Sequence, residues 1–279
     1  MKDSIFHIMA QDDYLLGIND MELERLRFQH SVWGPLTRDF FARLGVKGGW
    51  KVLDAGAGPG FVTMDLRELV GSSGEVTALE LSPFYLEQAR KEAAGKSFDG
   101  IRFIQGRIEE TSLPSNEFDL VFSRWVLSFA PDPEDFLRPL IESLKPGGII
   151  AVEDYYYEGL SLWPTGGPFD QMGDVVRAHY RAAGGDPYVT GKLPGLFRAH
   201  GIQLFEFSPH CLAGGPQSPV MEWGHRFFTA HVEAMVEKGV VSQNMANAMV
   251  ADWRDHRNNP DTLFFSPIVV DVAGRRPFD

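Results

Sequence analysis

A short apolar strand that runs directly into three closely spaced glycines constrains this chain more than any other feature. Residues 52–60 read VLDAGAGPG, with Gly56, Gly58 and Gly60 two positions apart. Glycine has no Cβ and reaches positive φ without strain, so a ligand can lie directly on the backbone at such a turn. A strand, a glycine turn and a helix in this order are typical of loops that bind nucleotide cofactors. The motif therefore predicts a nucleotide-type ligand on an α/β fold.

Short strands and helices alternate from Lys51 to Asp154. We expect strands over 51–55, 75–80, 101–105, 118–123 and 148–154, and helices over 61–70, 83–94 and 133–144. This alternation predicts a doubly wound α/β sheet. Apolar residues at roughly helical spacing before Lys51 predict two further helices ahead of the sheet.

After Asp154 the alternation lapses. We expect helices near 169–183, 191–200, 219–238 and 243–257, a strand over 202–208, and a final strand in LFFSPIVVDVAGRR. Two helical blocks thus interrupt the sheet, and we expect them to cover its ligand-binding edge. The predicted organisation is an N-terminal helical lid (1–48), a cofactor-binding core (49–154), helical substrate-covering inserts (155–200 and 213–261) and the remaining core strands (201–212 and 262–279).

The composition excludes several classes of protein. With 44% hydrophobic residues, a chain of 279 residues can bury one large core, with or without a lid. The net charge of −12 is spread along the chain, which argues against a nucleic-acid partner. The single cysteine, Cys211, excludes an internal disulfide. Nowhere do ~18 apolar residues follow one another, so we expect no membrane segment. The lone cysteine fits a reducing compartment, and we expect a cytoplasmic location. We also expect a monomer or homodimer.

A carboxylate stands where a ribose-binding residue is expected. In dinucleotide-binding loops an acidic residue lies about 20 positions beyond the last glycine and binds ribose hydroxyls. Glu80 occupies that place, at the end of the strand VTALE. Because a carboxylate can accept hydrogen bonds from both hydroxyls of a ribose, Glu80 fits NAD and S-adenosylmethionine equally well.

The glycine spacing separates these two cofactors in part. Dinucleotide loops favour G-x-G-x-x-G, whereas this chain has G-x-G-x-G with Asp54 two residues before the first glycine. An anion at Asp54 would repel a pyrophosphate and attract the positively charged sulfonium and amino groups of S-adenosylmethionine. The alternative is that Asp54 only braces the loop through hydrogen bonds.

Four segments in a fixed order resemble one family. They are VLDAGAGPG at 52–60, VTALELSP at 76–83, FDLVFSRWVLSFAPDP at 118–133 and LKPGGIIAVED at 144–154. With these segments the chain resembles class I S-adenosylmethionine-dependent methyltransferases, in the small-molecule branch that includes quinone-biosynthesis and natural-product enzymes. The resemblance implies a Rossmann-like fold, with a mostly parallel seven-stranded sheet and helical lid insertions.

The resemblance also implies where the cofactor would bind. The three glycines would pack under its methionine and ribose parts, and Glu80 would bind the ribose hydroxyls. Leu81 and Ser82 would flank the adenine and ribose, while Ser123 and Arg124 would contact the methionine end. The segment around Tyr14 resembles an N-terminal lid, and Tyr14 could close over the sulfonium by a cation–π contact.

One position departs from the family pattern. Where the family has an acidic or amide residue that reads the adenine amino group, this chain has QGRIEE, which places Arg107 there. Either the Ile108 backbone holds the adenine edge, or Arg107 stacks on the ring, or cofactor recognition has changed.

Catalysis of methyl transfer needs positioning above all, and a general base only where the acceptor must lose a proton. The weak candidates for a base are Asp154, Tyr155 and His179, with Glu153, Tyr156, Tyr157, His225 and His231 as further possibilities. We expect the histidines to be packed, hydrogen-bonded core residues. No cluster at metal-ligand spacing is present, since Glu153 and Asp154 are adjacent and point to opposite faces of a strand, so no metal is predicted.

Aromatic residues are dense after the fifth strand. The set comprises Tyr155, Tyr156, Tyr157, Trp163, Phe169, Tyr188, Trp223, Phe227 and Phe228. They could line a flat apolar pocket or form the core of a lid. We therefore expect a small-molecule acceptor of aromatic or apolar character; a polar, narrow or basic pocket would contradict this. An NAD-linked oxidoreductase and a protein that binds S-adenosylmethionine without turnover are the alternatives.

Overall fold

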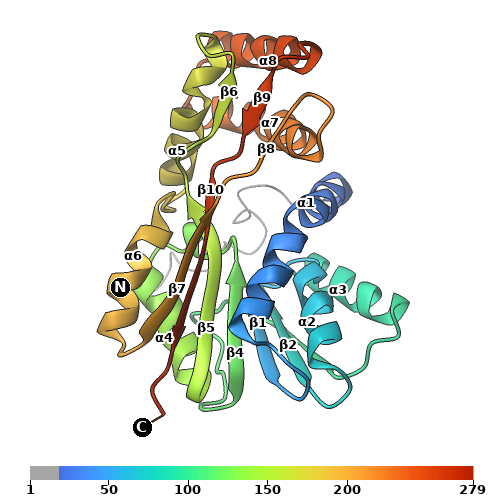
Figure 1. The fold of residues 1–279 in the computed structure, drawn as a ribbon, viewed down its shortest axis with the longest axis vertical. Coiled ribbons are helices and arrows are strands. Elements are labelled where there is room, and N and C mark those ends of the chain that lie inside the picture. Colours follow the sequence, from blue (N-terminus) through green and yellow to red (C-terminus); the bar gives the residue numbers. More distant parts are fainter. Residues whose placement is uncertain (1–18, 279) are drawn as a thin grey trace, which may run out of the picture.

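The computed structural model describes residues 19–278, in which seven strands form one twisted sheet (Figure 1). The strands are β1 (Lys51–Ala55), β2 (Glu75–Glu80), β3 (Ile101–Gln105), β4 (Phe118–Arg124), β5 (Leu144–Tyr156), β7 (Gln203–His210) and β10 (Ile268–Arg275). Their order is β3-β2-β1-β4-β5-β10-β7, and only β10 runs antiparallel to its neighbours. This confirms the predicted doubly wound, mostly parallel seven-stranded sheet.

Helices cover both faces of this sheet. The helices α1 (Asp20–Leu44), α2 (Phe61–Val70) and α3 (Pro83–Gly95) lie on one side, and α4 (Pro133–Ser143) and α6 (Val189–Ala199) lie on the other. Alternate strand residues feed the two cores: Val52 and Leu120 pack with α1 and α2, whereas Leu53 and Val121 pack with α4 and α6. This alternation is the period of two that a sheet buried on both faces requires.

The N-terminal segment is one continuous helix and not the two that its pattern predicts. The side chain of Asn19 caps the start of α1 by accepting a hydrogen bond from Glu22 N, and Gly45 ends it with a φ of 74°. Pro35 lies inside the helix and removes one backbone donor. Trp33 and Phe40, on either side of the proline, are both buried, and this continuous burial outweighs the cost of the break.

The C-terminal run also differs from its prediction. LFFSPIVVDVAGRR forms two strands, β9 (Leu263–Phe265) and β10, which belong to different sheets. Between them Ser266 N donates to Leu212 O, and Pro267 has no N–H to donate, so the ladder is interrupted there. β9 joins β6 (Ser161–Trp163) and β8 (Ala213–Gly214), two short strands that the sequence did not predict.

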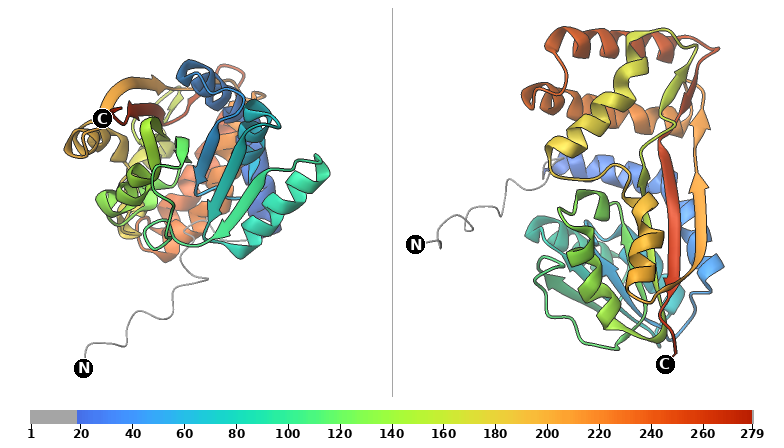
Figure 2. Two further views of the ribbon diagram at one scale, coloured as in Figure 1. Left: turned by 90° about the horizontal axis from the view of Figure 1, so that it is seen from below. Right: turned by 90° about the vertical axis from the view of Figure 1, so that its left-hand side faces the viewer.

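This small sheet and three helices, α5 (Met172–Ala182), α7 (Pro219–Glu237) and α8 (Gln243–Asn258), form what we call the cover. The cover stands over the carboxyl ends of the parallel strands, and α1 passes beneath α7 (Figures 1 and 2). The helix α6, predicted within the covering insert, packs on β5, β7 and β10 and so belongs to a helical layer of the main sheet. Among the described helices, none combines the length and apolar composition that crossing a membrane would require.

Candidate active site

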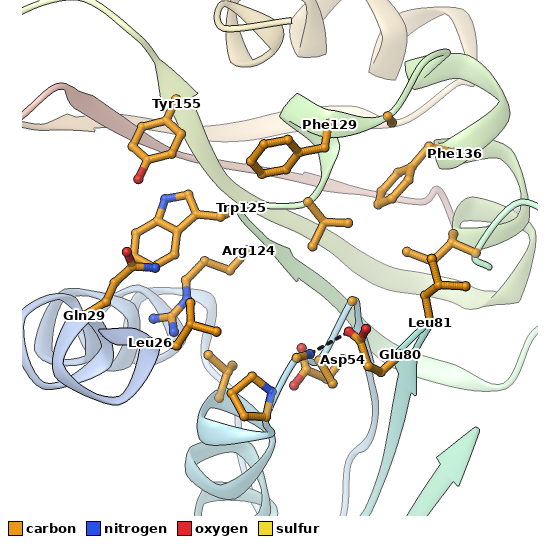
Figure 3. A pocket seen from close by; sticks show the side chains of 18 of the residues that line it. Leu26, Gln29, Asp54, Glu80, Leu81, Arg124, Trp125, Phe129, Phe136 and Tyr155 are labelled. Carbon is orange, nitrogen blue, oxygen red and sulfur yellow. Dashed lines mark hydrogen bonds between the residues drawn. The ribbon is translucent and has the colours of Figure 1, made fainter. Parts of the chain in front are cut away.

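A cavity of about 440 Å³ lies between the carboxyl ends of the central strands and the cover (Figure 3). This is the edge of a doubly wound sheet where ligands bind. The predicted site residues that border it are Asp54, Gly56, Gly58, Glu80, Leu81, Arg107, Ile108, Arg124 and Tyr155. Gly60, Ser82, Ser123, Asp154 and His179 were also predicted, and none of these five borders the cavity.

The three glycines of the loop have different structural roles. All three have positive φ, of 80° at Gly56, 54° at Gly58 and 84° at Gly60. A Cβ on Gly56 would come within 2.4 Å of a Val126 methyl, whereas a Cβ on Gly58 would meet nothing within 4 Å. Gly58 is therefore the glycine that leaves open space over the loop.

Gly60 serves packing instead of lining the cavity. It begins α2, and a Cβ there would lie 2.6 Å from the Ala89 Cβ on α3. Gly60 thus allows the close approach of two helices, and its contact with a cofactor stays a prediction.

Glu80 is buried at the end of β2 and is held by the backbone. Its Oε2 accepts a hydrogen bond from Gly58 N at 2.8 Å, and its Oε1 accepts one from Ser82 N at 2.7 Å. Burial raises the pKa of Glu80, and these backbone donors oppose the rise. A carboxylate has about four acceptor positions, so these backbone donors leave acceptor capacity for a ligand hydroxyl.

Asp54 lies at the floor of the cavity. Its Oδ2 accepts a hydrogen bond of 2.6 Å from the Thr63 hydroxyl, which ties the end of β1 to α2. Burial raises the pKa of Asp54 to about 6, and the hydrogen bond from Thr63 and the charge of Arg124 oppose the rise. Asp54 therefore braces the loop through this hydrogen bond, and its side chain also borders the cavity.

The segment after β3 contributes three neighbouring residues to the cavity wall, Arg107, Ile108 and Glu109. Glu109 was not among the predicted site residues. It supplies an acidic side chain two positions beyond Arg107, close to where the family pattern has one, and the printed motif QGRIEE contains it. Leu81 borders the same region, whereas the Ser82 hydroxyl caps α3 by accepting from Tyr85 N.

The end of β4 places a buried cation in the wall. Arg124 donates to the Thr37 hydroxyl at 2.9 Å, lies 3.1 Å from His30 Nδ1 and is 3.9 Å from the carboxylate of Glu153. Burial lowers the pKa of Arg124, and Glu153 opposes this. Its neighbour Ser123 donates to Ala55 O and so connects two strands instead of facing a ligand.

Trp125 follows in a backbone conformation that few large residues adopt. Its φ is 54°, and its indole stacks on the ring of Tyr155 with a centroid distance of 5.9 Å and an interplanar angle of 14°. Residues whose backbone is held in the left-handed region are enriched at functional sites. Trp125 was not among the predicted site residues, because a backbone angle leaves no mark in the sequence.

The acidic candidates for a general base point away from the cavity. Asp154 is fully buried and accepts hydrogen bonds from Ser128 N at 3.0 Å and Tyr155 N at 2.8 Å. Glu153 accepts from the Thr37 hydroxyl at 3.0 Å on α1. Burial raises the pKa of Asp154 to about 6 and that of Glu153 to about 7. Neither carboxylate borders the cavity.

The histidines of the cover are packed, but His179 and His231 have buried ring nitrogens without a hydrogen-bond partner among the described residues. His179 is 1% exposed, and neither of its ring nitrogens has a hydrogen-bond partner among the described residues. Burial lowers its pKa to about 4. His231 is also buried, with its pKa lowered to about 3, whereas His225 Nδ1 accepts from Trp253 Nε1 at 3.2 Å. Tyr14 lies outside the described residues.

Aromatic side chains form much of the cavity wall, though mostly not those that the sequence singled out. The rings that border it belong to Phe61, Trp125, Phe129, Phe136, Tyr155, Tyr180 and Phe227. Trp223 and Phe228 instead pack in the core of the cover, and Trp163 is 57% exposed. The basic residues Arg25, Arg107 and Arg124 also border the cavity, which weighs against a wholly apolar acceptor.

The comparisons with known proteins agree with this geometry. A family model described as a methyltransferase domain matches residues 47–172. The ubiquinone/menaquinone biosynthesis C-methyltransferase UbiE of Azotobacter vinelandii is 32% identical over 127 residues, 45% of this chain and 49% of that protein. The demethylmenaquinone methyltransferase of Staphylococcus aureus is 34% identical over 44% of this chain and 48% of its own length. The chain thus spans about half the length of these curated relatives.

A solved structure extends the likeness in fold. A putative methyltransferase from Bacillus halodurans superposes with a TM-score of 0.60 at 17% identity, over 86% of this chain and 97% of its own. The fold is thus the methyltransferase fold that the sequence predicted, and residues 47–172 match a methyltransferase domain. More narrowly, residues 47–172 are a methyltransferase domain similar in sequence to those of the quinone C-methyltransferases.

Proposed function

We propose that this protein transfers a methyl group from S-adenosylmethionine to a small aromatic acceptor. One observation carries the proposal: a single cavity joins the acidic floor of Asp54 and Glu80 to a wall of aromatic rings. The floor offers charge and hydrogen-bond acceptors to a cationic adenosyl cofactor, and the rings offer a planar apolar surface to an acceptor.

The residues of the floor fit the cofactor. Glu80 keeps acceptor capacity for a ribose hydroxyl, and the open space over Gly58 admits the ligand against the backbone. Leu81 and Ile108 would flank the adenine, and Glu109 would accept from its amino group. Asp54 would face the positively charged methionine part.

When bound, S-adenosylmethionine supplies the methyl carbon, whose bond to sulfur breaks as the electron pair of the acceptor forms the new bond. The protein contributes mainly the alignment of the two partners in a cavity closed by the cover. Trp125 directly follows β4 and Tyr155 lies in the neighbouring strand β5, so the acceptor ring would rest on two stacked rings held at the edge of the sheet.

The identity of the acceptor depends on the cover. The family model ends at residue 172, whereas Tyr180 of α5 and Phe227 of α7 complete the cavity from above. The names of the relatives reported above place them in quinone biosynthesis. This favours an acceptor with a ring of that size here. Because the cover lies outside the matched domain, we assign the aromatic class and not a particular compound.

The proposal is tested in two steps. Calorimetry should show binding of S-adenosylmethionine and S-adenosylhomocysteine, and mass spectrometry should then show methyl transfer to members of a panel of phenols, quinols and amines. Glu80→Ala serves as the binding-deficient control. Cofactor binding with no product across the panel would favour a protein that binds without turnover. Binding of NAD in place of S-adenosylmethionine would overturn the proposal.

A further inference from the structure

Hydrogen-bond donors gather on the side of the cavity away from Asp54 and Glu80. Arg25 and Gln29 reach it from α1, and Tyr155 reaches it from the end of β5. Figure 3 shows the Tyr155 hydroxyl turned toward the Gln29 amide, with Trp125 beside them and Glu80 at the opposite edge. The donors on Arg25, Gln29 and Tyr155 indicate which class of acceptor this side of the cavity could bind.

Gln29 is held so that it can only donate to a ligand. Its Oε1 accepts hydrogen bonds from Arg25 Nη1 at 2.9 Å and from Trp223 Nε1 at 3.1 Å. Both donors are unambiguous, so they fix the orientation of the amide and occupy both lone pairs of its oxygen. The amide NH₂ has no acceptor among the described residues, and it remains available at the cavity.

The guanidinium of Arg25 also has N–H groups that make no hydrogen bond to the described residues. Its guanidinium donates twice to the Glu22 carboxylate, at 2.8 and 2.7 Å, and once to Gln29. A guanidinium has five N–H groups, so two are left without an acceptor in the part of the chain that the structure describes. Glu22 does not border the cavity, whereas Arg25 does, so the positive end of this ion pair faces the ligand space.

Tyr155 adds a third donor. Its hydroxyl makes no hydrogen bond to the residues described, and burial raises its pKa far above neutrality, so the group is a protonated phenol and not a base. The neighbouring Trp125 Nε1 is buried and likewise has no acceptor among these residues. Among the described residues, this side of the cavity is therefore rich in donors and has no carboxylate on its surface.

The carboxylates that border the described cavity are Asp54, Glu80 and Glu109. They come from the ends of β1 and β2 and from the segment after β3, on the cofactor side. An acceptor that had to lose a proton beside Tyr155 would find no carboxylate base among the described residues there. An acceptor that releases its proton to water before it binds would need none, and Arg25 would stabilise the resulting anion.

We infer that the acceptor is an aromatic phenolate or enolate whose oxygen is bound by Arg25, Gln29 and Tyr155. The inference rests on the proposed methyl transfer and names its substrate class. The electron pair of the anion forms the bond to the methyl carbon as the carbon–sulfur bond breaks, so the anion and the sulfonium give two neutral products. Methylation at carbon leaves a ketone, which returns to the phenol when the ring proton moves to the oxygen.

Binding of 4-nitrophenolate and of nitrobenzene, with S-adenosylhomocysteine present, tests the inference. The two probes share ring and nitro group and differ in the anionic oxygen. We expect the wild-type protein to bind the phenolate about tenfold or more tightly than nitrobenzene, which is the scale of a charged hydrogen bond. The visible absorbance of the phenolate should also report a lowered pKa of the bound probe.

Three variants assign the effect to residues. Gln29→Leu and Tyr155→Phe should each reduce the preference for the phenolate several-fold and leave nitrobenzene binding intact. Glu22→Gln with Arg25→Gln removes both buried charges together and should abolish the preference. Arg254→Gln removes an exposed arginine of α8 and should change nothing. If the double variant shows no thermal unfolding transition, the two single variants decide.

The possible results distinguish a failure of the inference from a failure of the proposed function. Equal affinity for the two probes in the wild-type protein, or a preference that survives all three variants, would overturn the inference alone. Methyl transfer only to uncharged amines would do the same. Failure of S-adenosylhomocysteine to bind in calorimetry would overturn the proposed function, whatever the aromatic probes show.

Discussion

The backbone N–H of Gly58 donates a hydrogen bond of 2.8 Å to Glu80 Oε2, across 22 residues of sequence. This bond connects the glycine loop after β1 to the tip of β2. The open loop conformation and the orientation of the carboxylate therefore depend on each other. Cofactor binding would use both at once.

Glu80→Ala should weaken the binding of S-adenosylmethionine by about 2–3 kcal/mol, because charged hydrogen bonds to the ribose diol are lost. Glu80→Gln should lose less, since the amide keeps one acceptor oxygen. Calorimetry measures the affinities, and thermal unfolding checks that the loop stays folded. Unchanged affinity in Glu80→Ala would remove this residue from the site.

Gly58→Ala and Gly60→Ala should separate binding from folding. A Cβ at Gly60 meets Ala89 at 2.6 Å, so this variant should lose about 1–3 kcal/mol of unfolding free energy. A Cβ at Gly58 has the same cost of a positive φ but meets no protein atom within 4 Å, so this variant should be destabilised less and should mainly reduce cofactor affinity. Denaturant unfolding and calorimetry on both variants provide the comparison. The reverse order of stabilities would contradict it.

Cofactor affinity should fall in acid because of Asp54. Burial raises its pKa to about 6 in the free protein, and a cationic ligand favours the ionised form. Affinity should therefore be constant above about pH 7 and decline as the pH falls through 6, by up to tenfold per unit. In Asp54→Asn the affinity should be lower at neutral pH and lack this step. Calorimetry across the pH range measures both, and an identical decline in the variant would assign the proton to another group.

His179→Leu should stabilise the cover. The imidazole is buried with no partner among the described residues, so an apolar side chain of similar size removes a desolvation cost of about 1 kcal/mol or more. Since burial lowers the pKa of His179 from 6.5 to about 4, the unfolded chain binds a proton more readily, and stability is lost as the pH falls through this range. The variant should lose less stability there. Loss of methyl transfer in an otherwise stable variant would instead return His179 to the list of catalytic residues.

Periodic patterns made the main sheet predictable. The strand of Lys51–Ala55 and the helix of Phe61–Val70 have the bounds that the sequence predicted, because apolar residues at periods of two and 3.6 mark them. The short strands β6 and β8 were missed, since two or three residues carry no period. The segment of α1 was predicted as two helices, because a local pattern cannot weigh the burial on both sides of Pro35.

The sequence by itself determined the class of this protein. Glycines that reach positive φ, a carboxylate about 20 positions downstream and alternating elements are local features, and local chemistry suffices to predict a loop and its ligand. Only the tertiary structure decided which side chains share the cavity. Arg25, Trp125 and Tyr180 lie on separate elements, and their meeting depends on how the cover packs over the sheet. Such packing has no period along the chain, so the donors that point to an anionic acceptor became visible only in the fold.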